Sequence, residues 1–147
     1  MDSVRQATER GVSGQVVVPR LLIGGFVLPA ELVQVMESGR WKPPDMQVLR
    51  EVFDDDPDDP RFYDLPSMAR QNELLRAQSP EVYRDLVGPE CDIDPSRCLV
   101  VGDLGVDMSI ALHYGADGGD PRVIYLGLSG WREVAPNFRV LVERLRL

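Results

Sequence analysis

The sequence is poor in cysteine and in long apolar runs. Its 147 residues include two cysteines, Cys91 and Cys98, which are too few for a disulfide framework and too oddly spaced for a zinc site. The longest apolar runs, residues 16–18 and 21–28, are far shorter than the roughly 20 residues that span a membrane. No charged segment precedes an apolar stretch at the N-terminus, which argues against a signal peptide. We therefore expect a cytoplasmic protein that does not contact a membrane.

Common catalytic signatures are also absent. The sequence contains no Gly-x-Ser-x-Gly elbow, no Walker motif and no Gly-x-Gly-x-x-Gly loop. The one histidine, His113, has no Ser or Cys elbow near it in sequence, so it does not indicate a triad. The one lysine is Lys42, between Trp41 and Pro43. These absences favour binding over catalysis, and we expect no cofactor and no bound metal.

Acidic residues, by contrast, are abundant and unevenly distributed. The chain has 24 acidic and 16 basic residues, a net charge of −8. Residues 54–120 contain 16 of the acidic residues but five of the basic ones. Because phosphate binding requires clustered Lys and Arg, this distribution argues against a nucleic-acid ligand. The acidic middle would attract a basic partner, although a solvated surface is the simpler explanation for any one of these residues.

Apolar spacing and turn residues predict an α+β fold in one domain of residues 1–147. Helices are expected where a cap or a proline precedes an amphipathic stretch: at Pro29, Pro43-Pro44, Asp64, Ser79-Pro80 and Asn137. Short strands are expected where apolar or alternating residues lie between turn residues: at 15–18, 21–27, 98–101, 108–113 and 123–126. The first two are expected as strands or a hairpin, with Gly24-Gly25 as a turn or bulge. Short links rich in Gly and Asp between the last three strands favour an antiparallel meander.

The low-complexity run at residues 54–60 is predicted to be a loop, because it combines prolines with adjacent like charges. Its aspartates are Asp54, Asp55, Asp56, Asp58 and Asp59. The run lacks the alternating spacing and the distal Glu of a calcium loop, and adjacent aspartates point in different directions. A solvated loop and a docking site for a basic surface are the two remaining interpretations.

One motif points to an enzyme instead. Val100-Val101-Gly102-Asp103, followed by Asp107, resembles the last motif of haloacid-dehalogenase-type phosphatases, in which acids hold Mg²⁺ beside a nucleophilic aspartate. The rest of that pattern is missing, since no Asp-x-Asp-x-Thr/Val follows an apolar strand near the N-terminus. A metal-dependent phosphatase that uses Asp103 and Asp107 is therefore the alternative to a binding protein.

The second half of the chain carries a second pattern. It consists of residues 99–105 around Gly102-Asp103, the apolar segments 110–112 and 121–126, and Trp131 followed by Val134-Ala135-Pro136-Asn137-Phe138. With Leu28-Pro29-Ala30-Glu31-Leu32, this pattern resembles the SUKH superfamily, the Smi/Knr-like domains. The chain departs from it at His113, where many members have an acid, and residues 40–90 are not explained by it.

The resemblance implies an α+β fold with a mixed, mainly antiparallel sheet packed with helices, and no catalytic residues. It also implies protein binding. Many bacterial members are similar to immunity proteins that neutralise toxins, often nucleases, while eukaryotic relatives act as interaction scaffolds. A scaffold without a toxin partner is thus a further alternative.

Charge and resemblance together predict a protein partner, in the most specific form a basic toxin whose cleft an acidic surface covers. The candidate contact residues are Asp54, Asp55, Asp56, Asp58, Asp59, Asp92, Asp94, Asp103, Asp117, Asp120 and Trp131. Tryptophan is frequent at binding hot spots, although a tryptophan that closes the edge of a small core is the simpler interpretation of Trp131. The sequence leaves the oligomeric state open.

Overall fold

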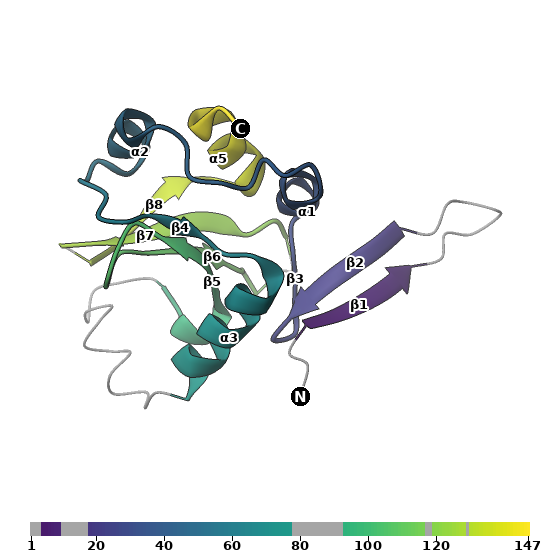
Figure 1. Ribbon diagram of the computed structural model, residues 1–147. Coiled ribbons are helices and arrows are strands. Elements are labelled where there is room, and N and C mark those ends of the chain that lie inside the picture. Colours follow the sequence, from purple (N-terminus) through teal and green to yellow (C-terminus); the bar gives the residue numbers. More distant parts are fainter. Residues whose placement is uncertain (1–3, 10–17, 78–92, 117–118, 129) are drawn as a thin grey trace.

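The computed structural model describes residues 4–9, 18–77, 93–116, 119–128 and 130–147 (Figure 1). Within them the strands form two sheets. The three-stranded sheet has the order β1 (Val4–Glu9), β2 (Val18–Ile23), β3 (Phe26–Val27). The five-stranded sheet has the order β4 (Arg61–Phe62), β5 (Cys98–Asp103), β6 (Ser109–His113), β7 (Arg122–Gly127), β8 (Gly130–Ala135). The α+β class is confirmed, and every strand pair within the described residues is antiparallel rather than mixed.

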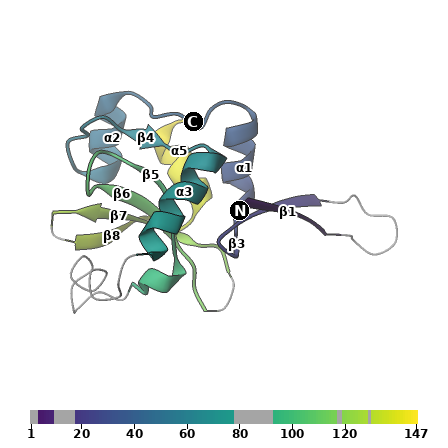
Figure 2. The same cartoon turned by 60° about the horizontal axis from the view of Figure 1, so that its bottom comes forward.

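Helices cover both faces of the five-stranded sheet. They are α1 (Ala30–Glu37), α2 (Met46–Phe53), α3 (Leu65–Arg76), the short 3₁₀ helix η1 (Pro95–Arg97) and α5 (Phe138–Leu145). Figures 1 and 2 show α1, α2 and α5 on one face and α3 on the other, where α3 packs beside β5. None of the described helices has the length and apolar character needed to cross a bilayer.

Side-chain caps begin three of these helices. Asp64 accepts a hydrogen bond from the Ser67 backbone N–H at 2.8 Å, and Asn137 accepts one from Val140 at 2.9 Å, as their positions in the sequence predict. Asp45 caps α2 through the Gln47 N–H at 2.8 Å. Helix α2 therefore starts after Asp45 and not at the proline pair, because Asp45 supplies an acceptor for the first turn.

The core lies between the sheet and the helices α1, α2 and α5. Leu99, Leu112 and Val123 from three neighbouring strands are fully buried there. The core also includes Phe53 of α2 and Phe138 of α5, which are fully buried or nearly so. These buried side chains hold the sheet against the helices, so the strand ends that carry the loops have fixed positions.

Asn72 of α3 closes the open edge of β5. Because β4 has two residues, it leaves Val100 of β5 without a strand neighbour on that side. The Asn72 amide donates to the Val100 carbonyl and accepts from the Val100 N–H, both at 2.8 Å. A buried side chain thus satisfies backbone groups that would otherwise need another strand.

Several expected elements are confirmed and others were missed. The meander of β5, β6 and β7 is confirmed, and so is the turn at Gly24-Gly25, which divides the run 21–27 between β2 and β3. Strands β1, β4 and β8 were not predicted. The helix expected at Ser79-Pro80 lies outside the described residues.

Candidate functional site

The β5–β6 turn, the β7–β8 turn and the acidic loop, which we define as residues 54–60, meet at one end of the five-stranded sheet. The pairs Asp103–Ser109 and Gly127–Gly130 lie next to the two turns, and the pair Arg61–Asp103 brings the end of the acidic loop to the first turn. Figures 1 and 2 both show these segments on the same side of the molecule. We define the acidic end by its aspartates: Asp54, Asp55, Asp56, Asp58, Asp59, Asp103 and Asp107.

The acidic loop is docked onto the β5–β6 turn. The Asp58 backbone N–H donates to the carbonyl of the fully buried Leu104 at 2.6 Å. A Cβ atom added to Gly105, whose φ is +151°, would lie 2.7 Å from the Asp58 carbonyl oxygen. Leu104 N–H donates across the turn to the Met108 carbonyl at 2.9 Å. The loop, for which the sequence left a solvated loop and a docking site as alternatives, is therefore held against the turn by close backbone contact.

Two tyrosine hydroxyls hold carboxylates at this end. Tyr125, which is fully buried in β7, donates to Asp55 Oδ2 at 2.7 Å. Tyr63 donates to Asp103 Oδ2. Burial and then the bonded carboxylate raise the pKa of both tyrosines far above the ordinary value of 10.0. Both hydroxyls thus remain donors over the physiological pH range, and they fix two of the candidate carboxylates.

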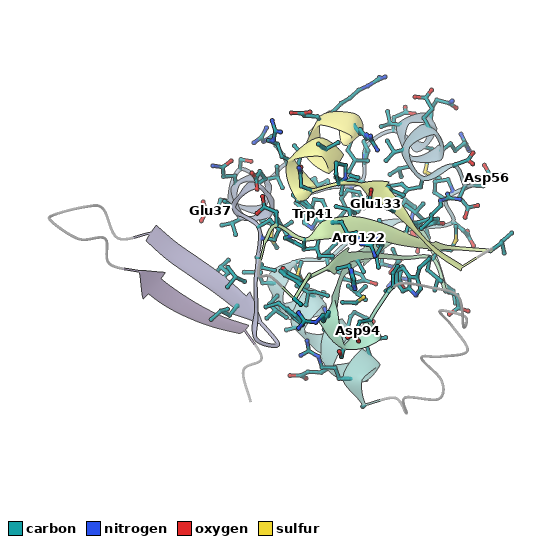
Figure 3. All side chains as sticks on the ribbon, turned by 180° about the vertical axis from the view of Figure 1, so that it is seen from behind. Glu37, Trp41, Asp56, Asp94, Arg122 and Glu133 are labelled. Atoms are coloured by element: carbon teal, nitrogen blue, oxygen red, sulfur yellow. The ribbon has the colours of Figure 1, made fainter. Side chains whose placement is uncertain are left out.

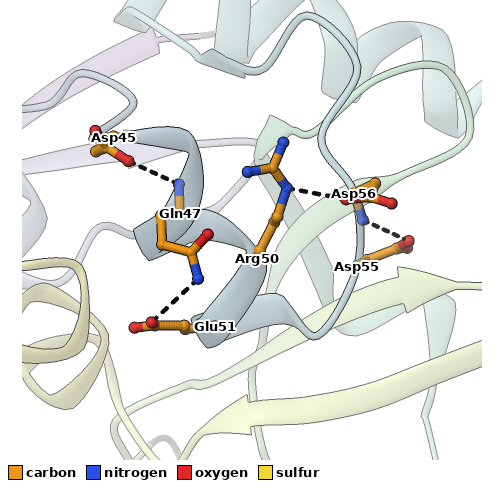
Figure 4. Close-up of polar contacts among 6 residues, drawn as sticks. All are labelled: Asp45, Gln47, Arg50, Glu51, Asp55 and Asp56. Atoms are coloured by element: carbon orange, nitrogen blue, oxygen red, sulfur yellow. Dashed lines mark hydrogen bonds and ion pairs between the residues drawn. The ribbon is translucent and has the colours of Figure 1, made fainter.

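An ion pair joins the acidic loop to α2. Arg50 Nε lies 2.9 Å from Asp56 Oδ1, and the Asp56 N–H donates to Asp55 Oδ1 at 2.9 Å (Figure 4). The Asp56 side chain remains 88% exposed in this pair. An exposed pair of this kind contributes little to stability, so Asp56 stays accessible to a partner.

Two further arginines contact the loop. Arg61 Nη2 lies 3.6 Å from Asp59 Oδ2, and both side chains are largely exposed. The Arg132 guanidinium lies over the Tyr125 ring, 5.4 Å from its centroid, and donates to the Asp54 carbonyl at 3.4 Å. The seven aspartates of the acidic end therefore face three arginines, which leaves a formal charge of −4, half of the net charge of the chain.

The other described candidate acids lie elsewhere. Asp94 caps η1, where it accepts hydrogen bonds from the Ser96 N–H at 3.0 Å and the Ser96 hydroxyl at 2.7 Å. These bonds lower the pKa of Asp94. Asp120 lies two residues before β7, at the end of the sheet where His113 pairs with Arg122. Figure 3 shows Asp94 well apart from Asp56. Asp92 and Asp117 lie outside the described residues.

Trp131 lies near the acidic end but points to the other face of the sheet. It pairs with Leu126, whereas the next residue, Arg132, pairs with Tyr125. Side chains alternate along a strand, so Trp131 and Arg132 project to opposite faces. The Trp131 indole N–H is buried, and it has no hydrogen-bond partner among the described residues. The structure therefore separates Trp131 from the aspartates with which the sequence grouped it.

The phosphatase-like motif forms a tight hairpin in this structure. Asp103 ends β5 and Asp107 sits in the following turn with a φ of +59°, while β6 returns antiparallel to β5. The described residues contain no group of three His, Cys, Asp or Glu side chains that could hold a metal ion. The geometry therefore adds no support to the metal-dependent alternative.

Sequence reasoning missed several residues of the acidic end. Tyr125 was predicted only as part of a strand, and Tyr63 was not singled out. No local signal identifies their carboxylate partners, because these lie 70 and 40 residues away, respectively. Val106 and Leu128 occupy the two hairpin turns and are almost fully exposed. A signal did exist for these two, since each is an isolated apolar residue in a segment of turn-forming residues.

A scan against models of known protein families, a search of curated proteins and a search of solved structures each found no match.

Proposed function

We propose that this chain is a protein-binding module whose acidic end docks onto a basic protein surface. The observation that carries the proposal is a concentrated negative charge on a fixed frame, with seven aspartates and three arginines around two hairpin turns. Hydrogen bonds from Tyr125 and from the Asp58 N–H hold the loop, and one from Tyr63 holds Asp103. Preorganised contact groups lose less conformational entropy on binding, which favours affinity.

In its most specific form, the proposal is an immunity-type protein of the SUKH kind that neutralises a toxin in the cytoplasm. The support is the resemblance of residues 28–39 and 98–145 to that superfamily, together with the charge of the acidic end. A nuclease cleft binds phosphates with clustered Lys and Arg. An acidic partner would approach such a cleft under complementary fields and cover it.

The test is a capture experiment from extract of the native host at low and at high salt. The bait proteins are the wild type, the variant Asp56→Asn/Asp59→Asn, and the control Asp94→Asn/Asp120→Asn, which removes the same number of charges. All substitutions preserve size, and Asn is accepted both at helix caps and at left-handed positions such as Asp59. We expect one basic protein to be retained at low salt by the wild type and by the control, and lost from the Asp56→Asn/Asp59→Asn variant.

Two results would contradict this proposal. One is the recovery of no salt-sensitive basic protein by the wild type. The other is equal loss from both variants, which would show that the total charge matters and the acidic end does not.

A second step separates an immunity protein from a scaffold. The captured protein is expressed alone and together with this chain in a bacterial host. We expect growth arrest when it is expressed alone and rescue on co-expression, and we expect its gene to lie directly upstream in the native genome. A captured protein that is harmless when expressed alone would favour the scaffold.

A further inference from the structure

Two large apolar side chains project from the hairpin turns of the acidic end. Val106 in the β5–β6 turn is 89% exposed, and Leu128 in the β7–β8 turn is fully exposed. The other exposed large hydrophobic residues of the described chain, Val27, Met46 and Leu74, lie on other elements and are between 38% and 58% exposed. Turns favour Gly, Asn, Asp and Ser, and Val106 and Leu128 depart from this preference. Because both side chains are almost fully exposed, packing among the described residues does not explain them.

Short backbone contacts hold both turns. On either side of Val106, Leu104 N–H donates to the Met108 carbonyl at 2.9 Å, and Met108 N–H donates to the Gly105 carbonyl at 3.2 Å. The second turn is closed by the pair Gly127–Gly130. Because β6 and β7 are adjacent strands, the two turns are neighbours at the same end of the sheet (Figures 1 and 2).

We propose that Val106 and Leu128 are paired apolar anchors that insert into apolar recesses on the partner, while the surrounding aspartates meet Lys and Arg around those recesses. The sign of the partner's charge rests on the proposed function; the two anchors rest on their own exposure and position. Interfaces commonly combine a desolvated apolar centre with a polar rim, and the centre carries most of the affinity. A negative rim also disfavours anionic lipid as the occupant, so the partner is a basic protein with exposed apolar side chains.

The test uses two fluorescein-labelled model peptides of equal length and equal positive charge. One alternates Lys with Leu and the other alternates Lys with Ser, and binding is followed by fluorescence anisotropy at low salt. The proteins are the wild type, Val106→Ser/Leu128→Ser, and the control Val27→Ser/Leu74→Ser, which removes exposed apolar groups from β3 and α3. All four substitutions lie at exposed positions, so circular dichroism and thermal unfolding should show intact folds.

We expect the wild type and the control to bind the Lys/Leu peptide at least tenfold more tightly than the Lys/Ser peptide, which corresponds to burial of about one aliphatic side chain. The Val106→Ser/Leu128→Ser variant should lose that preference and still bind both peptides weakly. Three results would overturn the inference. The preference for the Lys/Leu peptide could survive in the Val106→Ser/Leu128→Ser variant, it could be lost equally in the control, or the wild type could show no such preference. Binding to neutral phosphatidylcholine vesicles instead of the Lys/Leu peptide, if it depends on Val106 and Leu128, would overturn the inference in favour of a lipid surface.

This outcome is independent of the host capture experiment. If the peptide preference depends on Val106 and Leu128 while host extract yields no basic protein, the proposed function fails and the apolar anchors stand. Alternatively, a basic host protein is captured through the acidic end, and the Val106→Ser/Leu128→Ser variant binds this protein and both peptides as the wild type does. In that case the proposed function stands and the apolar anchors fail.

Discussion

The two ends of the five-stranded sheet use the same residue type in different ways. At the acidic end, Asp55 and Asp103 are held by tyrosines that lie 70 and 40 residues away in sequence. At the opposite end, Asp94 is held by Ser96, two residues away. Asp94 therefore serves its own segment as a helix cap, whereas the acidic end exists only in the folded chain. Local contacts explain the placement of Asp94 completely, whereas the placement of Asp55 and Asp103 depends on contacts between segments distant in sequence.

The ends also differ in their cations. At the opposite end, Arg122 Nη1 lies 3.8 Å from Glu133 Oε1, and Arg122 Nε donates to His113 Nδ1 at 3.2 Å. Arg97 donates to the Gly115 carbonyl at 3.0 Å. Cations are thus interleaved among acceptors there. At the acidic end, three arginines leave four negative charges in excess. A basic protein approaching this chain would therefore be oriented toward the acidic end.

The largest effect should come from breaking the contact between the acidic loop and the β5–β6 turn. Gly105→Ala places a Cβ 2.7 Å from the Asp58 carbonyl at a φ of +151°, so the loop must move and the backbone is strained. We expect a loss of about 2–4 kcal/mol of unfolding free energy, measured by urea denaturation.

The control for this substitution is Gly25→Ala. Gly25 also has a positive φ, +86°, but no atom lies within 4 Å of the added Cβ. It should therefore lose about 1 kcal/mol, the cost of the backbone conformation alone. Equal losses in the two variants would show that docking of the loop contributes nothing, and the two ends would then differ less than their contacts indicate.

The parts of this structure that the sequence predicts are those with local causes. Asp64 and Asn137 cap helices within three residues, and the alternation of residues 108–113 encodes β6. The two-residue strand β4 forms only because β5 pairs with it, and β8 carries Trp131-Arg132-Glu133, which shows no apolar alternation. Such elements depend on partners distant in sequence, which propensity does not report.

The candidate site divides along the same line. The acidic run was identified from composition, and its membership of one surface with Asp103 could not be, because that depends on the register of β4 against β5. The face that Trp131 occupies could not be predicted either, because nothing local in the sequence states which face of β8 it lies on. Asp94 and Asp120 were grouped with the loop by charge alone, and the fold places them at the other end.

A smaller effect tests the tyrosine–carboxylate contacts. Tyr125→Phe should cost about 1–2 kcal/mol at neutral pH, because Asp55 loses a hydrogen-bond donor. The raised pKa of Tyr125 favours the protonated folded state. Its contribution is therefore complete below the ordinary tyrosine pKa of about 10 and is lost as the pH rises above it toward the folded value. Urea denaturation at about pH 8 and about pH 11 should show a smaller alkaline loss in Tyr125→Phe than in the wild type.

Tyr114→Phe sharpens this test. Burial also raises the pKa of Tyr114, but its hydroxyl donates to the Val27 carbonyl at 2.7 Å and not to a carboxylate. This variant should likewise reduce the alkaline loss, and it should leave salt-sensitive partner capture unchanged. If Tyr125→Phe leaves capture unchanged as well, fixed placement of Asp55 is not needed for binding.

The smallest effect belongs to the opposite end. Hydrogen bonds from Ser96 lower the pKa of Asp94, so ionised Asp94 stabilises the folded chain above the ordinary Asp pKa, and this contribution is lost as the pH falls through the folded value. Asp94→Asn keeps a capping oxygen and should change the unfolding free energy at pH 7 by no more than about 0.5 kcal/mol. Below about pH 4 its stability should fall less steeply than that of the wild type. Asp120→Asn removes the same charge from the same end at a position that caps none of the described helices, so it is the matched charge control for that slope. If Asp120→Asn flattens that slope equally, net charge rather than the cap sets the acid response, and the contrast between local and long-range carboxylates would not extend to this end.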